Sequence, residues 1–233
     1  MPKVVFDTLT FMSRLERLKS WFYKKIEPYL GERILEAGCG TGNLTSYLSG
    51  KQLVLAVDND SDMLDECRSR FSDNPNVKFL RYDLTDPSIT KLSENNLDTV
   101  VCVNTLEHIK DDEAVLRNFN SVLSEGGTLI LLVPAFQSLY CSLDRAAGHY
   151  RRYSLPEVSE KIEKCGFTVD KKMYFNFFGL IGWFFNGKVL KKEKISTRLL
   201  RMFNFLTPLL DFFENLIGPP IGLSIILVCR KRE

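Results

Sequence analysis

Short, continuously apolar segments alternate with amphipathic ones along most of the chain, and this alternation constrains the fold more than any other feature. Seven segments have the character of strands: 33–38, 53–58, 77–83, 97–104, 128–134, 167–175 and 222–232. Apolar runs such as "LDTVVCV" are typical of parallel strands that are buried on both faces. Strands that alternate with helices favour a doubly wound parallel sheet. The sequence therefore predicts an α/β fold.

Composition supports one globular unit and excludes several classes of protein. The chain has 233 residues, 45% of them apolar, and a net charge of +2, so a general nucleic-acid surface is not expected. The six cysteines are widely spaced with no C-x-x-C pair, which is typical of reduced thiols. The N-terminal segment lacks the apolar core of a signal peptide, and no apolar run reaches the length of a membrane span. We expect a cytoplasmic protein.

A glycine turn follows the first predicted strand in the segment "EAGCGTGN". Its glycines are Gly38, Gly40 and Gly42. The dinucleotide fingerprint G-x-G-x-x-G would need a further glycine where the chain has Asn43, so a nicotinamide-dependent oxidoreductase is disfavoured. Asp58 ends the second strand about 20 residues on, where a carboxylate can accept hydrogen bonds from ribose hydroxyls. The pattern predicts a nucleoside-containing ligand at this edge of the sheet.

Several motifs in order resemble the class I S-adenosylmethionine (SAM)-dependent methyltransferases. They are "LEAGCGTG", "VDNDSDML", "YDL", "VNTLEHI" and "LSEGGTLILLVP". The chain is also similar to bacterial and archaeal methyltransferases of the small-molecule or glycan type, such as the type 11 and type 12 groups, which carry a segment like "GHYRRYS" and an apolar C-terminal cap. The resemblance implies a Rossmann-like seven-stranded sheet whose last strand is antiparallel.

The resemblance also implies a set of cofactor-binding residues. The set is Glu36, Gly38, Gly40, Gly42, Asp58, Asn59, Met63, Asp83, Leu84 and Asn104. Glu36 and the glycine turn would lie against the methionine part of SAM, near the backbone carbonyl of Asn104. Asp58 would hold the ribose, and Asp83 would accept from the exocyclic amine of the adenine beside the Leu84 backbone. Asn59 and Met63 would flank the adenine, although Met63 also fits a simple core position.

Two histidines are available to a methyl acceptor. Methyl transfer needs alignment of the nucleophile with the methyl group and, for an oxygen or amine acceptor, a base. His149 follows the fifth strand, so it is the candidate base or substrate-orienting residue, with a structural histidine as the alternative. His108 is expected on the substrate side. Some family members bind a metal through E-x-x-E-H, but Asn104 replaces the first glutamate here, so no metal is expected.

The segment "GHYRRYS" divides into a structural part and a part available to substrate. Ser154 begins an S-x-x-E capping box, and Tyr153 occupies the position that packs against the following helix. Tyr150, Arg151 and Arg152 are candidate substrate-binding residues. Adjacent residues of an extended segment point to opposite faces, so at most one arginine is expected to face the site. An inward arginine would favour an anionic acceptor.

An aromatic-rich insertion precedes the last strand. The predicted organisation within one domain is an N-terminal helix (1–30), a SAM-binding core (31–135), an acceptor-side loop, helix and strand (136–175), an apolar helical cap (176–220) and a last strand (221–233). The insertion could cover the site, form a homodimer face, or contact a bilayer or lipid-linked substrate with the help of the basic run "KKEK".

These observations predict a SAM-dependent methyltransferase that produces S-adenosylhomocysteine (SAH). The expected acceptor is an oxygen of a small molecule, sugar or lipid-linked metabolite. N-methylation is the alternative within the class. A SAM-binding protein without catalysis is the alternative from another class.

Overall fold

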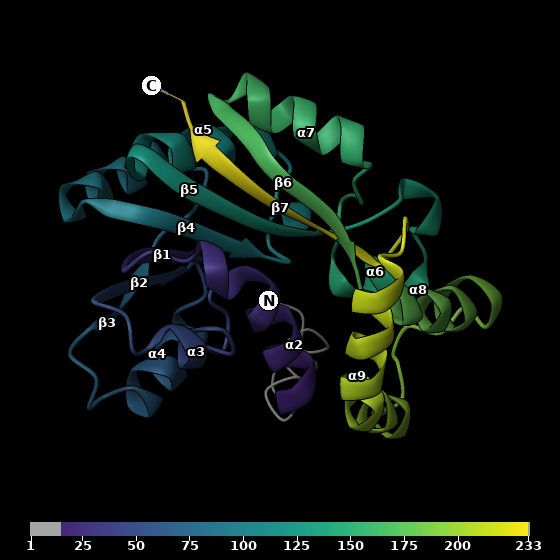
Figure 1. The fold of residues 1–233 in the computed structure, drawn as a ribbon. Helices are drawn as coiled ribbons and strands as arrows, with labels where there is room; N and C mark the ends of the chain where they lie inside the picture. The colour runs from purple at the N-terminus through teal and green to yellow at the C-terminus, as the bar shows by residue number, and fades with distance from the viewer. Residues whose placement is uncertain (1–14, 233) are drawn as a thin grey trace.

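The computed structural model describes residues 15–232 and contains one seven-stranded sheet (Figure 1). The strands are β1 (Arg33–Ala37), β2 (Leu53–Asp58), β3 (Val77–Arg81), β4 (Leu97–Val103), β5 (Leu123–Pro134), β6 (Phe167–Phe175) and β7 (Ser224–Lys231). Their order is β3-β2-β1-β4-β5-β7-β6, with β7 antiparallel to both of its neighbours. This confirms the predicted doubly wound sheet with an antiparallel last strand.

Helices cover both faces of the sheet, because successive side chains of the buried strands point to opposite faces. On one face, Ile34 and Val54 pack with residues of α2 (Glu16–Ile26), α3 (Thr45–Leu48) and α4 (Ser61–Arg70). On the other face, Leu35 and Leu55 pack with residues of the 3₁₀ helix η2 (Pro87–Asn95), α5 (Asp112–Val122) and α7 (Leu155–Lys164). The predicted N-terminal helix is present as α2, while residues 1–14 lie outside the described part.

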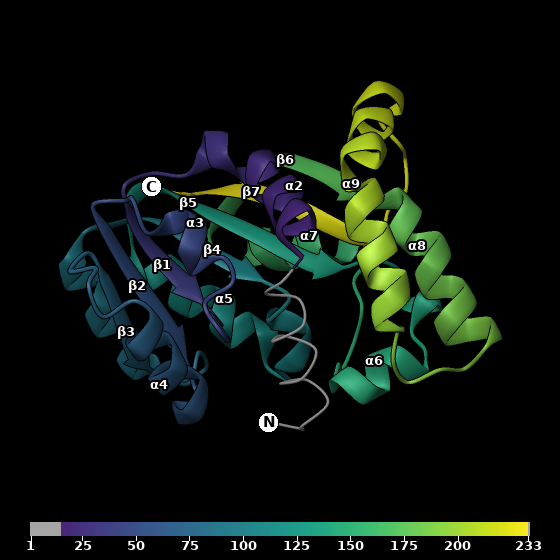
Figure 2. The same ribbon diagram turned by 90° about the horizontal axis from the view of Figure 1, so that it is seen from below.

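The insertion before β7 is helical, as predicted. It forms α8 (Phe177–Trp183), the π-helical turn η5 (Phe184–Val189) and α9 (Thr197–Ile217). Figure 2 shows α8 and α9 side by side at one end of the sheet, with α6 (Ser142–Ala147) next to them. Among residues 15–232, no helix has the length and apolar character that crossing a membrane requires.

The segment between β5 and α7 differs from the irregular loop expected there. It contains the short 3₁₀ helix η4 (Gln137–Leu139) and α6. Helix α6 begins where the backbone N–H of Cys141 donates to Asp144, and it ends at Gly148 with a φ of +80°. The segment then returns along the end of β5, where Ala135 and Tyr153 form a parallel bridge.

Side chains and a glycine cap the ends of two helices, and the cap at Ser154 was predicted. The carboxylate of Asp60 caps α4 by accepting from the N–H groups of Asp62 and Met63. Ser154 caps α7, and Gly166 follows that helix with a φ of +89°, in the left-handed region that favours glycine. The six cysteines are all buried free thiols, as predicted.

Candidate functional site

The glycine turn adopts a backbone that other residues rarely adopt. Gly38, Gly40 and Gly42 have φ values of +77°, +52° and +71°. A side chain at Gly38 would also collide with Thr105, whose Oγ1 lies 2.2 Å from the position of an added Cβ. The turn after β1 is therefore packed against the turn after β4, and glycine is required at position 38 by both backbone and space.

Asp58 ties this turn to the end of β2. Its side chain is 9% exposed. Its Oδ2 accepts from the backbone N–H of Gly40 at 2.9 Å, and its Oδ1 accepts from that of Asp60 at 3.1 Å. Each carboxylate oxygen can accept more than one hydrogen bond, so these contacts orient the carboxylate while leaving it acceptor capacity.

Arg70 stabilises the same turn from α4 and was not anticipated from the sequence. Its guanidinium donates to the carbonyl oxygens of Thr41 at 3.0 Å and Gly42 at 2.7 Å. Two donors on adjacent carbonyls fix the turn in one conformation. An arginine in the last turn of a helix is common, so the sequence held no specific signal for this role.

Glu36 lies within β1, directly before the turn. It is 4% exposed, and its Oε2 accepts from the hydroxyl of Thr45 at 2.6 Å. Burial raises the pKa of Glu36 to about 8, against the lowering effect of the Thr45 hydrogen bond. Glu36 therefore holds a proton through most of the neutral range.

The remaining predicted cofactor residues gather at the same edge of the sheet, and their roles remain predictions. Asn59 and Asn104 are exposed, and Asn104 has a φ of +46°. Met63 is 1% exposed, so most of its surface is covered by the protein. Asp83 lies two residues beyond β3, where its Oδ1 accepts from the backbone and hydroxyl of Thr85. Leu84 is buried, and its carbonyl accepts from the side-chain amide of Asn118.

In the segment that follows α6, His149 is held by a buried carboxylate. Its Nδ1 lies 2.9 Å from Oδ1 of Asp144, which also accepts from Nε of Arg152 at 2.7 Å. Burial opposes the charge on Asp144, but the hydrogen bonds from His149 and Arg152 and the arginine charge lower the pKa of Asp144 below its usual range. An ionised carboxylate only accepts, so Nδ1 of His149 carries the proton and Nε2 is left as an acceptor.

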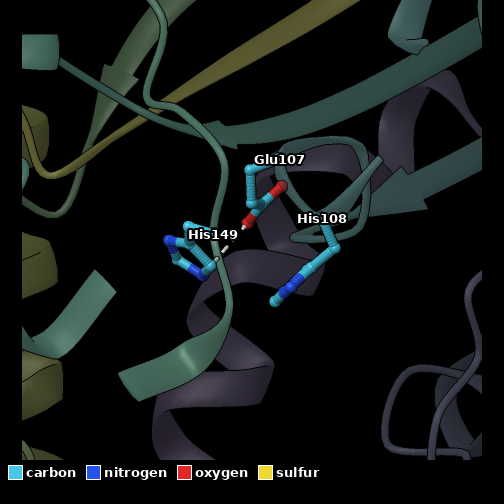
Figure 3. A group of neighbouring side chains, drawn as sticks. All are labelled: Glu107, His108 and His149. Atoms are coloured by element: carbon cyan, nitrogen blue, oxygen red, sulfur yellow. Dashed lines mark ion pairs between the residues drawn. The ribbon is translucent and has the colours of Figure 1, made fainter. Parts of the chain in front are cut away.

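The Nε2 atom of His149 faces a buried glutamate that follows β4 (Figure 3). Glu107 is 0% exposed, and its Oε1 lies 3.9 Å from Nε2 of His149. Neither carboxylate oxygen of Glu107 has a hydrogen-bond partner within residues 15–232. Burial raises the pKa of Glu107 to about 7 despite the opposing effect of His149. His108 packs edge-on against the His149 ring at 4.7 Å, and burial lowers the pKa of His108 to about 4.

These three side chains could offer ligand atoms to one cation. The ligand atoms of Glu107, His108 and His149 all lie within 4.8 Å of one another. Bond lengths of about 2.1 Å in a tetrahedral site imply ligand atoms about 3.4 Å apart, so these side chains would have to move closer together to hold zinc. The expectation that no metal binds here stays a prediction.

The two arginines of "GHYRRYS" point to different partners. Arg152 is 2% exposed and turned inward, with its guanidinium on Asp144 and over the ring of Trp183 at 4.7 Å. Arg151 instead donates to the carboxylate of Asp112 in α5 at 2.9 Å. The inward arginine therefore pairs with a carboxylate of the protein itself. A substrate role for either arginine stays a prediction.

The neighbouring tyrosines behave differently from each other. Tyr153 is fully buried, and its hydroxyl donates to Asp112 at 3.0 Å. It lies in the same core as Val158 of α7, which agrees with the packing position expected for it. Tyr150 is 51% exposed, and its backbone N–H donates to the carbonyl of Glu107 at 2.8 Å. Of the two tyrosines, Tyr150 is therefore the one that can meet a ligand.

The sequence is similar to known proteins over the segment that contains the glycine turn. Residues 34–127, which contain the glycine turn, Asp58 and Asn104, match the family model described as "Methyltransferase domain". Residues 34–127 therefore form a methyltransferase domain. The chain is 34% identical over 107 residues to the ubiquinone/menaquinone biosynthesis C-methyltransferase UbiE of Shewanella sp. strain ANA-3, covering 44% of this chain and 42% of UbiE. The chain spans less than half the length of the curated relatives it matches.

Solved structures share the fold of the methyltransferase domain at low sequence identity. An S-adenosylmethionine-dependent methyltransferase from Mesorhizobium loti is 15% identical with a TM-score of 0.62, covering 91% of this chain and 98% of that one. The [4+2]-cyclase SpnF is 16% identical with a TM-score of 0.60, covering 93% of this chain and 81% of that one. The fold alone therefore does not determine the reaction.

S-adenosylmethionine is the cofactor that the methyltransferase domain implies, and the residues present fit it. Asp58 offers a fixed carboxylate for vicinal ribose hydroxyls at the end of β2. Gly38, Gly40 and Gly42 carry no side chains, which permits close approach of a ligand to the backbone of the turn. Both features lie at the carboxyl edge of a parallel sheet, where ligands of such folds bind.

Proposed function

We propose that the protein transfers a methyl group from SAM to an oxygen of a small molecule, sugar or lipid-linked acceptor. The observation that carries this proposal is the Asp144–His149 pair next to the turn after β4. The backbone of Tyr150 donates to that of Glu107, so the acceptor segment is bonded directly to this turn. The cofactor-side turn contacts it as well, through Gly38 and Thr105.

SAM supplies an activated methyl group, whose bond to sulfur breaks as the bond to the acceptor oxygen forms, leaving SAH. The protein must then align the acceptor and remove one proton. His149 receives the hydroxyl proton of the acceptor at Nε2, because Nδ1 is already bonded to Asp144. The resulting imidazolium lies between the carboxylates of Asp144 and Glu107, which stabilise its positive charge.

The orientation of His149 does not depend on the acceptor. Its backbone N–H donates to the carbonyl of Asp144, and its carbonyl accepts from the hydroxyl of Tyr140 at 2.8 Å. Arg152 fixes Asp144 in turn. A base held in advance at the correct tautomer favours deprotonation of a hydroxyl, which ordinarily needs more assistance than an amine. N-methylation is the alternative reaction at the same site.

The test is a methyl-labelled SAM assay with both aqueous and lipid fractions of a cell extract as acceptor. Label is expected in an alkali-stable ether, while label in an amine would identify the N-methylation alternative. Calorimetry in parallel should show binding of SAH and no binding of NAD. Binding of NAD in place of SAH would refute the cofactor.

A second candidate is a SAM-binding protein that transfers no methyl group, which the fold shared with the [4+2]-cyclase SpnF keeps open. SAH binding without label transfer to any fraction would favour that candidate.

A further inference from the structure

Apolar side chains are concentrated on one part of the surface. Within residues 15–232, every large hydrophobic side chain that is exposed, apart from Tyr150, lies between 181 and 221. The most exposed are Phe205 at 69%, Phe212 at 62%, Leu216 at 71% and Ile217 at 64%. We call the exposed surface of α8, η5 and α9 the helical face. Exposed apolar side chains concentrated on neighbouring helices in this way (Figure 2) are typical of an interaction site.

Helix α9 presents two different sides. Outward residues recur at helical spacing: Met202, Phe205, Leu209, Phe212 and Leu216. The acidic residues of α9 are both turned toward the protein. Asp211 lies 3.6 Å from Lys25 of α2. Glu214 is 5% exposed and accepts from the backbone N–H groups of Asn176 and Phe177 at 2.9 Å. The outward side of α9 therefore carries no acidic residue.

Cationic side chains adjoin the apolar ones. The segment from η5 to the first turns of α9 contains these exposed cationic residues: Lys188, Lys191, Lys192, Lys194, Arg198 and Arg201. One exposed acid, Glu193, lies among them. Val189 and Leu190, both more than half exposed, are interleaved with the lysines. Long basic side chains beside exposed aliphatic ones suit an interface between water and hydrocarbon, because their stems can be buried while their charges stay in water.

We propose that the helical face is a docking surface for a lipid bilayer that contains anionic lipids. Its apolar residues would enter the boundary of the acyl chains, and its basic residues would meet the headgroups. The helices lie on the membrane, since no helix in the described part of the chain can span one. A second copy of the chain is the less suitable occupant, because a twofold interface through this face would bring together two basic segments that each carry one acid, Glu193, among six cationic residues.

The helical face is joined to the acceptor side of the site. The hydroxyl of Ser142 in α6 donates to the carbonyls of Gly187 and Lys192 at 3.2 and 2.5 Å. Trp183 lies over Arg152, which holds Asp144. Docking would therefore bring the segment that carries His149 to the membrane surface. Given the proposed function, this makes a lipid-linked or membrane-dissolved molecule the acceptor class.

Vesicle flotation tests the docking surface directly. The full-length chain is mixed with phosphatidylcholine vesicles with and without phosphatidylserine. We expect binding to the anionic vesicles that weakens as salt is raised, and little binding to the neutral ones. Lys191→Ala with Lys192→Ala removes two cations worth about 1 kcal/mol each near such a surface, so affinity should fall roughly thirtyfold. The matched control is Lys78→Ala with Lys91→Ala, two exposed lysines on the edge strand β3 and on η2, outside the helical face, and it should leave affinity unchanged.

A second pair of variants tests the apolar part. Phe212→Ser with Leu216→Ser alters side chains that are 62% and 71% exposed, so the fold should be retained, which circular dichroism and unchanged SAH binding would verify. Vesicle affinity should drop by more than about tenfold. Absence of vesicle binding by the parent chain would overturn the proposal, as would equal binding by these variants. A dimer in solution that the serine variants dissociate, without vesicle binding, would assign the face to a second copy instead.

Failure of docking and failure of the proposed function give different results. SAH binding and label transfer to the aqueous fraction, with no vesicle binding, would leave the methyltransferase standing and remove the membrane surface. Vesicle binding without label transfer to any fraction would support the membrane surface and remove the proposed methyl transfer.

Discussion

Substitution of Glu107 by glutamine gives a direct test of the acceptor-side electrostatics. The carboxyl group is fully buried, has no hydrogen-bond partner within residues 15–232, and has its pKa raised from 4.5 to about 7, chiefly by burial. The folded protein therefore binds the Glu107 proton more tightly than the unfolded chain does. Stability from this group is fully present below about pH 4.5 and is lost as the pH rises through about 7.

The magnitude follows from the size of the shift. About 2.5 pH units between the two pKa values, at about 1.36 kcal/mol per unit, correspond to about 3 kcal/mol of unfolding free energy lost between pH 4.5 and 8. Glutamine has nearly the same shape and does not ionise. Glu107→Gln should therefore match the parent protein near pH 4 and exceed its stability by about 1 kcal/mol at pH 5 and about 3 kcal/mol at pH 8.

Urea unfolding followed by tryptophan fluorescence at several pH values from 5 to 8 measures this difference. Glu36, whose pKa burial also raises, is present in both proteins and cancels in the comparison. Glu94→Gln, at an exposed glutamate of η2, is the matched control and should show no such trend. A constant difference across the pH range would refute the reasoning. The measurement is repeated with a chelator, because a cation bound to Glu107 would make the glutamine variant less stable at pH 8 until the cation is removed.

Further variants test three other parts of the site. Asp58→Ala should weaken SAH affinity by 10-fold to 100-fold in calorimetry, at about 1.4–2.8 kcal/mol for hydrogen bonds to a charged group; unchanged affinity would contradict the ribose role. His149→Ala should lower turnover about 10²-fold to 10⁴-fold with SAH affinity intact, and Asp144→Asn should lower it as well by removing the partner that fixes the tautomer; normal turnover in both would exclude His149 as the base. Gly38→Ala should cost about 1–3 kcal/mol in thermal unfolding, with part of the loss restored by Thr105→Gly, because the added Cβ meets Thr105 in a strained backbone; equal stability of Gly38→Ala and the parent would contradict the packing described for this turn.

The cofactor side of the site could be predicted because its signals are local. A glycine turn directly after a buried strand, and an acid at the end of the next strand, are set by sequence neighbours and by strand order. Asp58 and Gly40 then come within 2.9 Å because β1 and β2 are adjacent and parallel. The cap at Ser154 followed from the same kind of short-range pattern.

The acceptor side could be predicted only in part because its contacts join distant segments. The approach of Glu107 to His149 depends on how the segment that follows β5 folds back toward the end of β4, and short-range sequence patterns do not determine that path. Helix α6 itself has six residues, which is too short to show a clear apolar period. The partner of Arg152 was equally hidden, since an isolated aspartate such as Asp144 gives no sign that it will be buried.

The two adjacent arginines both form ion pairs within the protein, and this affects how the site could recognise an acceptor. Arg151 ties the segment to α5 through Asp112, and Arg152 ties it to α6 through Asp144. Both positive charges are thus paired within the protein and hold the segment in place, so neither arginine is evidence that the acceptor is anionic. Of the residues predicted to face the acceptor, His108, His149 and Tyr150 are then left as candidates to contact it. With so few polar groups, the site can orient a hydroxyl but offers little to capture a small polar molecule from water. An acceptor that a membrane surface delivers beneath the helical face would need only these few polar contacts.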